Sequence, residues 1–451
     1  MRRIATPLGV LLLALSAFAL AGIATGAGWI GPDRLPGSTG AAASWGPVVA
    51  PSADQSSVAG STAVPSGAPG PSPSLRPSSP YLPSPLDQAG VRERLQAALD
   101  GGRVALAAPG VVASVLFPDG HQWTGTAGVA DLASGRTLAP ATPFAIASVS
   151  KTFLAAEILA LVGEGRLALD DAAATLIPGT IVGGRPLDAR ITVRQLLDHT
   201  SGLRDYLVDR ALDRAVRADP THAWTPDEAL AYVGPPVAAP GAGYHYANTN
   251  YVLLGRIAES LTGRSLAAEY RVRFLDPLGL RATFYQAVEP APGELATAYR
   301  YTSGALNATP VDVTDGTPIR PFTAITTAAG AAGSMASSAP DLARWARALY
   351  SGVALDPDLV RLMVDDASST AYLEPGASYG LGVQVLTIDG RIAYGHSGRL
   401  VGARSVVRWF PAEGIAIAIV TNESRFDPTS ILRDLLAIVA PESVAASSRP
   451  D

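Results

Sequence analysis

The chain has 451 residues, of which 48% are apolar and 16% are charged, so it can bury a large core. Its net charge of −5 argues against a nucleic-acid-binding surface. It contains no cysteine, which excludes disulfides, thiolate metal sites, a cysteine nucleophile and a lipidated-cysteine anchor.

The N-terminus has the pattern of an export signal. Met1-Arg-Arg is followed by an apolar run from Leu8 to about Ala24, which is close to the shortest length that spans a bilayer. We expect residues 1–30 to be either a cleaved signal peptide or an uncleaved signal anchor, with residues 8–24 anchoring the chain in the cell membrane. In both cases the rest of the chain would be extracytoplasmic, either secreted or anchored.

A long segment of low complexity follows. Residues 31–86 are dominated by Pro, Ser, Gly and Ala, with too few large apolar groups to offset the entropy of ordering. We expect a disordered linker there and a loose tail over residues 441–451. The folded domain is therefore predicted to span residues 87–440.

Within this domain the periodicity of apolar residues changes twice. A helix is expected over Leu86–Leu99, two strands joined by Pro118-Asp119-Gly120 over Val111–Phe117 and Trp123–Val129, and a helix over Phe153–Val162. Residues 170–345 are mostly of helical pattern. Four strands and a last helix are then expected, over Leu381–Ile388, Ile392–Tyr394, Ser405–Phe410, Ile415–Val420 and Ile431–Val439. This order predicts an α+β fold, in which an antiparallel sheet built from both chain ends is flanked by helices and joined to a mostly helical second lobe.

Lys151 is the single lysine of the chain, and every other one of its 34 basic residues is an arginine. A desolvated lysine can lose its proton, whereas a guanidinium stays charged. Ser148 lies three residues earlier, on the same face of the start of a predicted helix, where backbone N–H groups favour developing negative charge. This Ser-x-x-Lys pattern predicts a nucleophile and its activating amine. A helix-capping serine beside a surface lysine is the structural alternative.

Two further motifs carry groups suited to the same chemistry. Tyr246-Ala-Asn248 offers a phenol that can relay a proton and an amide that can orient the lysine or bind a substrate carbonyl. In the strand-rich end, His396-Ser397-Gly398 offers an imidazole, a hydroxyl and a glycine that permits close approach of a substrate. The N–H of the next residue, Arg399, and that of Ser148 would form an oxyanion hole. Taken alone, each motif is better explained by structure, the first as a loop tyrosine with a helix-capping Asn and the second as a strand that ends in a Ser-Gly turn.

The three motifs together resemble the serine β-lactamase and penicillin-binding-protein superfamily, in its branch of class C β-lactamases, D-alanyl-D-alanine carboxypeptidases and esterases. Segments 196–203 (LLDHTSGL) and 331–345 also resemble that branch, and the resemblance covers about residues 88–440. It implies a β-lactamase/transpeptidase-like fold with Ser148 acylated, Lys151 as its activating partner and Tyr246 as general base or acid. Asn248 and residues His396, Ser397, Gly398 and Arg399 would bind substrate, and neither a metal nor a cofactor is implied.

One position departs from the class C β-lactamases, which carry lysine where this chain has His396. Because an unperturbed histidine is mostly neutral at pH 7, it would bind a substrate carboxylate less firmly, unless Arg399 or Arg404 supplies the charge. We expect a serine hydrolase that forms an acyl-enzyme on an amide or ester of a small molecule or short peptide, cell-wall peptides included. It would be of carboxypeptidase, D-aminopeptidase or esterase type, with weak β-lactamase activity at most. The alternative is a membrane-tethered penicillin- or peptidoglycan-binding sensor without turnover.

Other motifs are predicted to be structural. Gly376-Ala-Ser-Tyr-Gly380 matches the nucleophile elbow of α/β-hydrolases, but a strand pattern follows it where that motif needs a helix. His199 is expected to stabilise the turn at Thr200-Ser-Gly202. The remaining histidines are scattered and lack metal-ligand spacing. The sequence leaves the exact substrate and the oligomeric state open.

Overall fold

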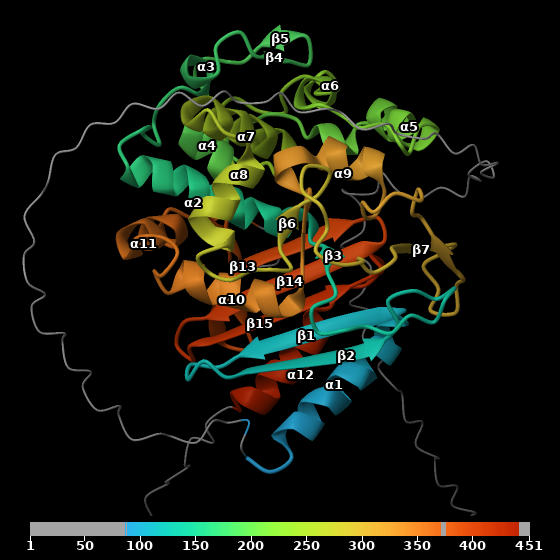
Figure 1. The fold of residues 1–451 in the computed structure, drawn as a ribbon. Coiled ribbons are helices and arrows are strands. Elements are labelled where there is room, and N and C mark those ends of the chain that lie inside the picture. Colours follow the sequence, from blue (N-terminus) through green and yellow to red (C-terminus); the bar gives the residue numbers. More distant parts are fainter. Residues whose placement is uncertain (1–85, 87, 371–375, 442–451) are drawn as a thin grey trace, which may run out of the picture. The chain divides into compact units, whose positions relative to one another are not determined.

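The computed structural model of the protein describes residues 86, 88–370 and 376–441 (Figure 1). The predicted export signal, nearly all of the predicted linker and the tail beyond residue 441 lie outside these described residues. Within them, no helix combines the length and the apolar character needed to cross a membrane.

An eight-stranded antiparallel sheet forms the centre of the domain (Figure 1). Its strands lie in the order β10-β11-β12-β13-β14-β15-β1-β2, so the N-terminal hairpin joins the C-terminal strands through β1 and β15. Strands from both chain ends therefore share one sheet, as predicted. The bounds are β1 Gly110–Leu116, β2 Gln122–Gly128, β10 Ser368–Ser369, β11 Ser378–Tyr379, β12 Gln384–Ile388, β13 Arg391–Leu400, β14 Ala403–Phe410 and β15 Ile415–Thr421.

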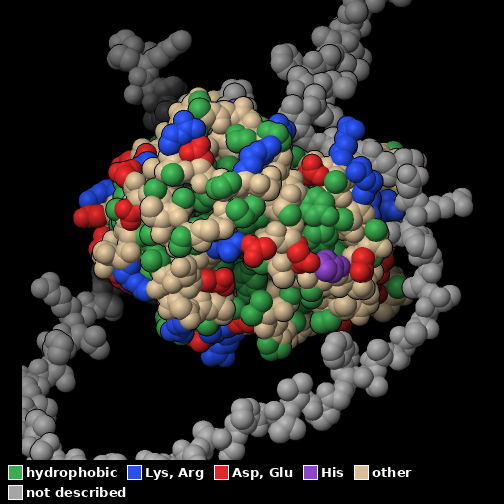
Figure 2. Space-filling model, turned by 90° about the horizontal axis from the view of Figure 1, so that it is seen from above, with side chains coloured by type: hydrophobic (Ala, Val, Ile, Leu, Met, Phe, Trp, Pro, Cys, Tyr) green, Lys and Arg blue, Asp and Glu red, His purple; other side chains and the backbone are tan. Residues whose placement is uncertain are grey.

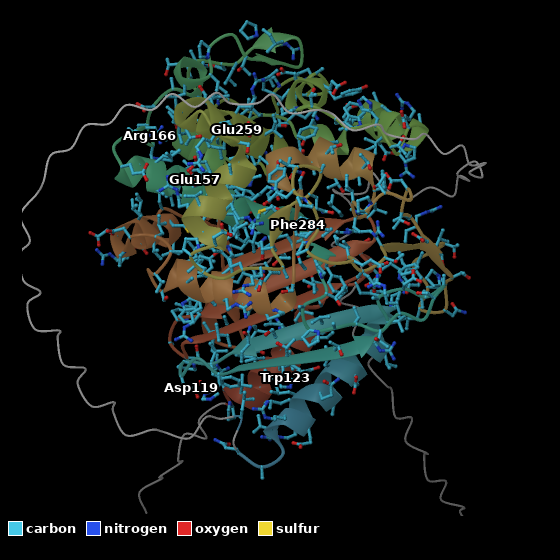
Figure 3. The ribbon with its side chains drawn as sticks, viewed as in Figure 1. Asp119, Trp123, Glu157, Arg166, Glu259 and Phe284 are labelled. Carbon is cyan, nitrogen blue, oxygen red and sulfur yellow. The ribbon has the colours of Figure 1, made fainter. Side chains whose placement is uncertain are left out.

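Both faces of this sheet are covered. Helices α1 (Val91–Leu106) and α12 (Thr429–Val439) pack on one face, whereas α10 (Ala339–Tyr350) and the helical lobe pack on the other (Figure 1). Strand β15 is a continuous apolar run because both of its faces are buried. Its isoleucines face α1 and α12, whereas its alternate alanines and Val420 face the helical lobe. In Figure 3, Trp123 lies in the core that the sheet forms with α1 and α12, and Phe284 lies in the other lobe.

The second lobe is mostly helical. Its helices are α2 Ser150–Gly163, α3 Ala173–Leu176, α4 Val193–Leu197, α5 Arg210–Ala218, α6 Pro226–Leu230, α7 Asn248–Thr262, α8 Leu266–Tyr270, α9 Thr323–Ala329 and α11 Pro357–Asp365. Short helical turns are η2 Ala147–Val149, η3 Tyr206–Val208, η4 Arg271–Leu275 and η5 Gly330–Ala332. Small sheets complete it, from β3 Phe144–Ala145, β4 Ile181–Val182, β5 Arg185–Pro186, β6 Phe284–Tyr285, β7 Tyr299–Tyr301, β8 Pro310–Asp312 and β9 Met335–Ser337.

The predicted α+β class is confirmed, and several element boundaries differ from the prediction. Helix α1 begins at Val91 instead of Leu86, because Gly90 has a left-handed backbone with a φ of 78°. Strand β13 continues to Leu400 instead of ending at Tyr394, since it stays paired with β14 along that length. The motif His396-Ser-Gly398 therefore lies inside a strand. On the helical face of the lobe, acidic and basic side chains are interspersed (Figure 2).

Candidate active site

Ser148 is held at the junction of the two lobes. It lies in η2, directly before α2, a helix whose residues are nearly all buried. The residue before it, Ala147, has a left-handed backbone with a φ of 48°, a strained conformation that is common next to functional groups. Ile146 fixes the turn from both sides, because its N–H donates to Met335 O at 3.0 Å and its carbonyl accepts from Ser405 Oγ at 2.7 Å.

Lys151 is fully buried and its amine contacts three oxygen atoms. Nζ donates to Asn248 Oδ1 at 2.7 Å, to Ala332 O at 2.8 Å and to Ser148 Oγ at 3.1 Å. The amide oxygen and the carbonyl can only accept, so they hold two N–H groups in either protonation state. The third position of the amine faces the serine, with a proton when the amine is charged and with a lone pair when it is neutral.

Burial lowers the pKa of Lys151 to about 7, an effect that the carboxyl of Asp205 partly opposes. An arginine at this position would stay charged. The chain therefore places its single lysine where an amine can exchange a proton with a hydroxyl near neutral pH.

Asn248 is the first residue of α7, and Tyr246 lies two residues before it. The phenol of Tyr246 donates to Ser148 Oγ at 2.9 Å, so the serine oxygen lies between this phenol and the lysine amine. Asn248 presents its oxygen to the lysine and donates from Nδ2 to Asp205 Oδ2 at 2.9 Å. Because a carboxylate only accepts, Asp205 determines which way the Asn248 amide faces. Burial raises the pKa of Asp205 itself, against the hydrogen bond from Leu207 N–H.

Strand β13 runs past η2 at very short range. A Cβ placed on Gly398 would lie 2.1 Å from Ile146 O, so only glycine lets the strand approach this closely. The N–H of Ser397 donates to the side chain of Gln384, the first residue of β12, at 3.1 Å. Amides of alternate residues point to the same edge of a strand, so the Arg399 N–H points to the part of that edge beyond the end of β12. The Arg399 side chain is exposed.

His396 is buried and both of its ring nitrogens are engaged. Nδ1 lies 2.6 Å from Ser397 O and Nε2 lies 2.9 Å from Tyr379 OH. Since the carbonyl can only accept, the proton is on Nδ1 and the phenol of Tyr379 donates to Nε2. Burial and the nearby charge of Lys151 lower the pKa of His396 to about 3, so the ring is neutral.

Arg404, which could supply positive charge to a substrate carboxylate, is already paired, because it forms an ion pair with Asp427.

The motifs predicted to be structural lie as follows. Gly376–Gly380 contains the short strand β11 and is followed by strand β12, with no helix between them. His199 lies against the Tyr246-Ala-Asn248 segment, with its ring 4.3 Å from that of Tyr246. Among the described residues, no three His, Asp or Glu side chains are grouped as metal ligands.

Sequence reasoning brought together Ser148, Lys151, Tyr246 and Asn248, but it missed several of their partners. Ala332 contributes a backbone carbonyl, which no side-chain pattern reveals. Asp205 lies two residues after the LLDHTSGL segment, yet its contact with Asn248 depends on how η3 packs against α7. Tyr379 lies in segment 376–380, whose pattern predicts no part in the site.

Comparison with known proteins places this geometry in a family. The sequence model of the Beta-lactamase family matches residues 93–440. Penicillin-binding protein 4 of Amycolatopsis lactamdurans is 30% identical over 388 residues, which cover 81% of this chain and 95% of that protein. Esterase EstB of Burkholderia gladioli is 30% identical over 386 residues, which cover 77% of this chain and 96% of that protein.

Solved structures agree with these matches. The D-stereospecific amidohydrolase from a Streptomyces species superimposes with a TM-score of 0.65 at 31% identity, over 79% of this chain and all of that one. The match of the family model to more than half of the chain, together with the two relatives, confirms the resemblance stated from the motifs. This chain therefore belongs to the Beta-lactamase family and is one of its serine hydrolases.

Proposed function

We propose that the protein hydrolyses amides or esters through an acyl-enzyme on Ser148. One observation carries this proposal: Ser148 Oγ lies 3.1 Å from the amine of Lys151 and 2.9 Å from the phenol of Tyr246, and that amine has a pKa of about 7. A nucleophile within hydrogen-bond reach of a base that is itself held by other groups is the general pattern of activated serines.

Lys151 and Tyr246 have different roles in proton transfer. Neutral Lys151 accepts the proton of Ser148 as Oγ attacks the substrate carbonyl carbon, and the N–H groups of Ser148 and Arg399 hold the resulting oxyanion. Tyr246 passes a proton to the departing nitrogen or oxygen, and the charged lysine replaces that proton on Tyr246. Water then attacks the acyl carbon and gives up a proton to the same pair, which returns a proton to Ser148 Oγ as the acid is released.

We further propose amides of D-amino acids, peptides with a D-residue at the amino end, and esters as the substrate class, in preference to peptides with a C-terminal carboxylate. His396 is neutral and saturated, and Arg404 is paired with Asp427, so neither offers a free positive charge to a carboxylate. Asp205 adds a carboxyl next to the site. The D-stereospecific amidohydrolase and the esterase among the similar proteins support the same choice.

A turnover panel tests this proposal. D- and L-amino-acid amides, p-nitrophenyl esters, a D-Ala-D-Ala peptide and nitrocefin would be compared on the wild-type protein, with Ser148→Ala and Lys151→Arg as variants. Ser148→Ala should reduce kcat by roughly three to six decades. Lys151→Arg should be nearly as inactive, because it keeps the charge and loses the proton-accepting lone pair.

Replacement of an exposed serine, Ser351→Ala, should leave every rate unchanged. Undiminished hydrolysis by Ser148→Ala would refute the assignment of the nucleophile. Stable labelling of Ser148 by a fluorescent penicillin or fluorophosphonate, with no turnover of any substrate, would instead support a penicillin- or peptidoglycan-binding sensor.

A further inference from the structure

His199 contacts the Tyr246-Ala-Asn248 segment on both sides of the tyrosine. Its backbone carbonyl accepts from His245 N at 2.8 Å, and its ring Nδ1 accepts from Ala247 N at 3.2 Å. The residues directly before and after Tyr246 are thus both bound to His199, the first to its carbonyl and the second to its fully buried side chain. Loss of the His199 ring would free the Ala247 N–H, whereas the backbone carbonyl of residue 199 would still accept from His245 N.

The protonation state of this ring follows from its neighbours. Asn250 Nδ2 lies 3.3 Å from Nδ1, and the Oδ1 of the same amide accepts from Ser201 Oγ at 2.7 Å, so Nδ2 must face the ring. With two donors directed at Nδ1, the ring proton is on Nε2. Burial and the charge of Lys151 lower the pKa of His199 well below its ordinary value, which keeps the ring neutral.

The ring of His199 also packs against the ring of Tyr246. It lies 4.3 Å from the ring of Tyr246 and 4.8 Å from that of Tyr379. Its Nε2 is buried and has no hydrogen-bond partner among the described residues, so this N–H is left with the weak attraction of aromatic faces. An unsatisfied buried donor costs stability, which argues that the ring serves its other contacts.

The backbone conformation at position 199 also limits which residues can stand there. Its φ of 62° is a left-handed conformation that most side chains avoid, whereas Asn, Asp and His adopt it more readily. Among these, asparagine carries its Oδ1 at the place of Nδ1 and could accept the Ala247 N–H, but it lacks the ring. The structure thus offers a variant that separates the hydrogen bond from the aromatic contact.

We propose that His199 is a positioning residue for catalysis, which holds the phenol of Tyr246 at hydrogen-bond distance from Ser148 by fixing the backbone on both sides of it. This inference rests on the proposed function, in which Tyr246 transfers a proton. It predicts that loss of the acceptor at Nδ1 slows the chemical step while leaving substrate binding nearly unchanged.

The test uses His199→Ala, His199→Phe and His199→Asn in the full chain. Displacement of a catalytic group by about 1 Å costs on the order of 100-fold, so we expect kcat to fall about 100-fold in the Ala and Phe variants, with KM changed less than about threefold. His199→Asn should recover kcat to within roughly tenfold of wild type. His222, which is half-buried and whose Nε2 lies 3.3 Å from Glu228 Oε1, is replaced by Ala as the matched control and should keep full activity.

Hydrogen–deuterium exchange provides a readout that needs no turnover. The amide of Ala247 should exchange faster in His199→Ala and His199→Phe than in wild type, with the wild-type rate restored in His199→Asn. If the wild-type protein hydrolyses nothing but shows this exchange pattern, the proposed function fails and the positioning contact stands. Equal kcat in the Asn and Ala variants, or a lower melting temperature with unchanged kcat, would overturn the positioning role.

Discussion

The carboxyl of Asp205 accepts a hydrogen bond of 2.9 Å from Nδ2 of Asn248, and this contact decides which atom of the amide faces Lys151. The amide oxygen then occupies one of the three positions around the lysine amine, and Ala332 O occupies another. Since both atoms only accept, the remaining position is kept for Ser148. A residue outside the predicted motifs thus helps to determine how the lysine meets the serine.

Two substitutions of Asp205 separate its charge from its role as acceptor. Asp205→Ala leaves the Asn248 amide free to turn, so we expect kcat/KM to fall on the order of 100-fold. Asp205→Asn keeps an acceptor and should lose less than about tenfold at its optimal pH. Because the charge of Asp205 raises the pKa of Lys151, the Asn variant should show its activity rise at lower pH than wild type. Steady-state rates between pH 5 and 9 would check this, and equal losses in both variants would contradict it.

The pH dependence of the wild-type protein follows from Lys151. Its pKa is lowered from 10.5 to about 7, so the amine is charged below pH 7 and neutral above it. If the neutral amine accepts the serine proton, kcat/KM for an uncharged ester should rise with pH through an inflection near 7 and then level off. The profile would be measured with a p-nitrophenyl ester, corrected for spontaneous hydrolysis. A rate that is flat from pH 6 to 9 would exclude this proton acceptor.

The close passage of β13 over η2 gives a prediction about backbone placement. In Gly398→Ala the new methyl group would lie 2.1 Å from Ile146 O and 2.5 Å from Ser405 Oγ, so the strand must move away from the turn that carries Ser148. We expect kcat/KM to fall on the order of 100-fold and stability to fall by about 1–3 kcal/mol. Gly101→Ala in α1 is the control, since its Cβ meets nothing within 4 Å and alanine favours a helix. Retention of full activity in Gly398→Ala would show that this approach is not needed.

The sequence predicted the fold class and the grouping of four side chains for an identifiable reason. A single lysine among arginines marked a place where the charge alone was not the requirement, and runs of apolar residues marked the strands of the sheet. Partners made by the backbone or by distant segments were not predictable in this way. Ala332 acts through its carbonyl, and Asp205 meets Asn248 only when η3 lies beside α7.

His396 shows where pattern and structure diverge. A histidine next to Ser-Gly suggested a side chain directed at substrate. In the strand, successive side chains point to opposite faces, and His396 falls on the buried side, where Tyr379 and Ser397 O engage its ring. Its assignment to substrate binding stays a prediction, as do the roles of Ser397, Gly398 and Arg399.

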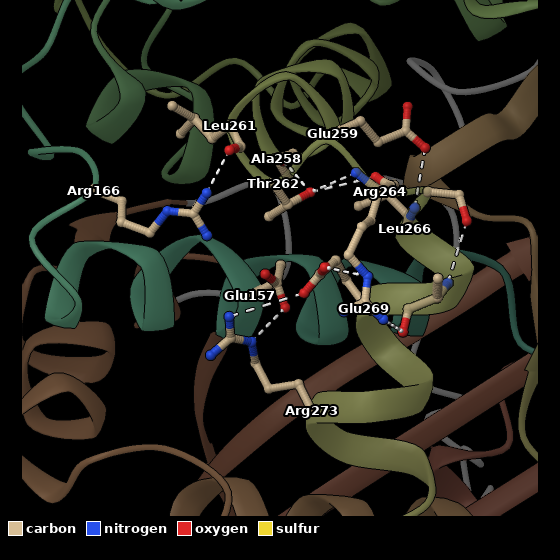
Figure 4. Close-up of polar contacts among 12 residues, drawn as sticks. Glu157, Arg166, Ala258, Glu259, Leu261, Thr262, Arg264, Leu266, Glu269 and Arg273 are labelled. Atoms are coloured by element: carbon tan, nitrogen blue, oxygen red, sulfur yellow. Dashed lines mark hydrogen bonds and ion pairs between the residues drawn. The ribbon is translucent and has the colours of Figure 1, made fainter. Parts of the chain in front are cut away.

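The helix that carries Lys151 also contains a buried acid. Glu157 on α2 is fully buried, and its Oε2 accepts from Arg273 Nε at 3.0 Å (Figure 4). Its Oε1 is buried with no hydrogen-bond partner among the described residues. Burial, which the charge of Arg273 only partly offsets, raises the pKa of Glu157 from 4.5 to about 7. The folded protein therefore binds this proton more tightly than the unfolded chain does.

This difference predicts how stability changes with pH. Below pH 4.5 the carboxyl is protonated in both states, and between pH 4.5 and 7 only the folded state holds the proton, so its contribution to stability is lost as pH rises. Glu157→Gln keeps the shape and cannot ionise. Relative to this variant, the wild-type protein should lose up to about 3 kcal/mol of unfolding free energy between pH 5 and 8, measured by urea denaturation. Glu164→Gln, which removes a more exposed carboxyl from the same Arg273, is the control. A constant difference between wild type and Glu157→Gln over this range would show that Glu157 stays ionised inside the protein.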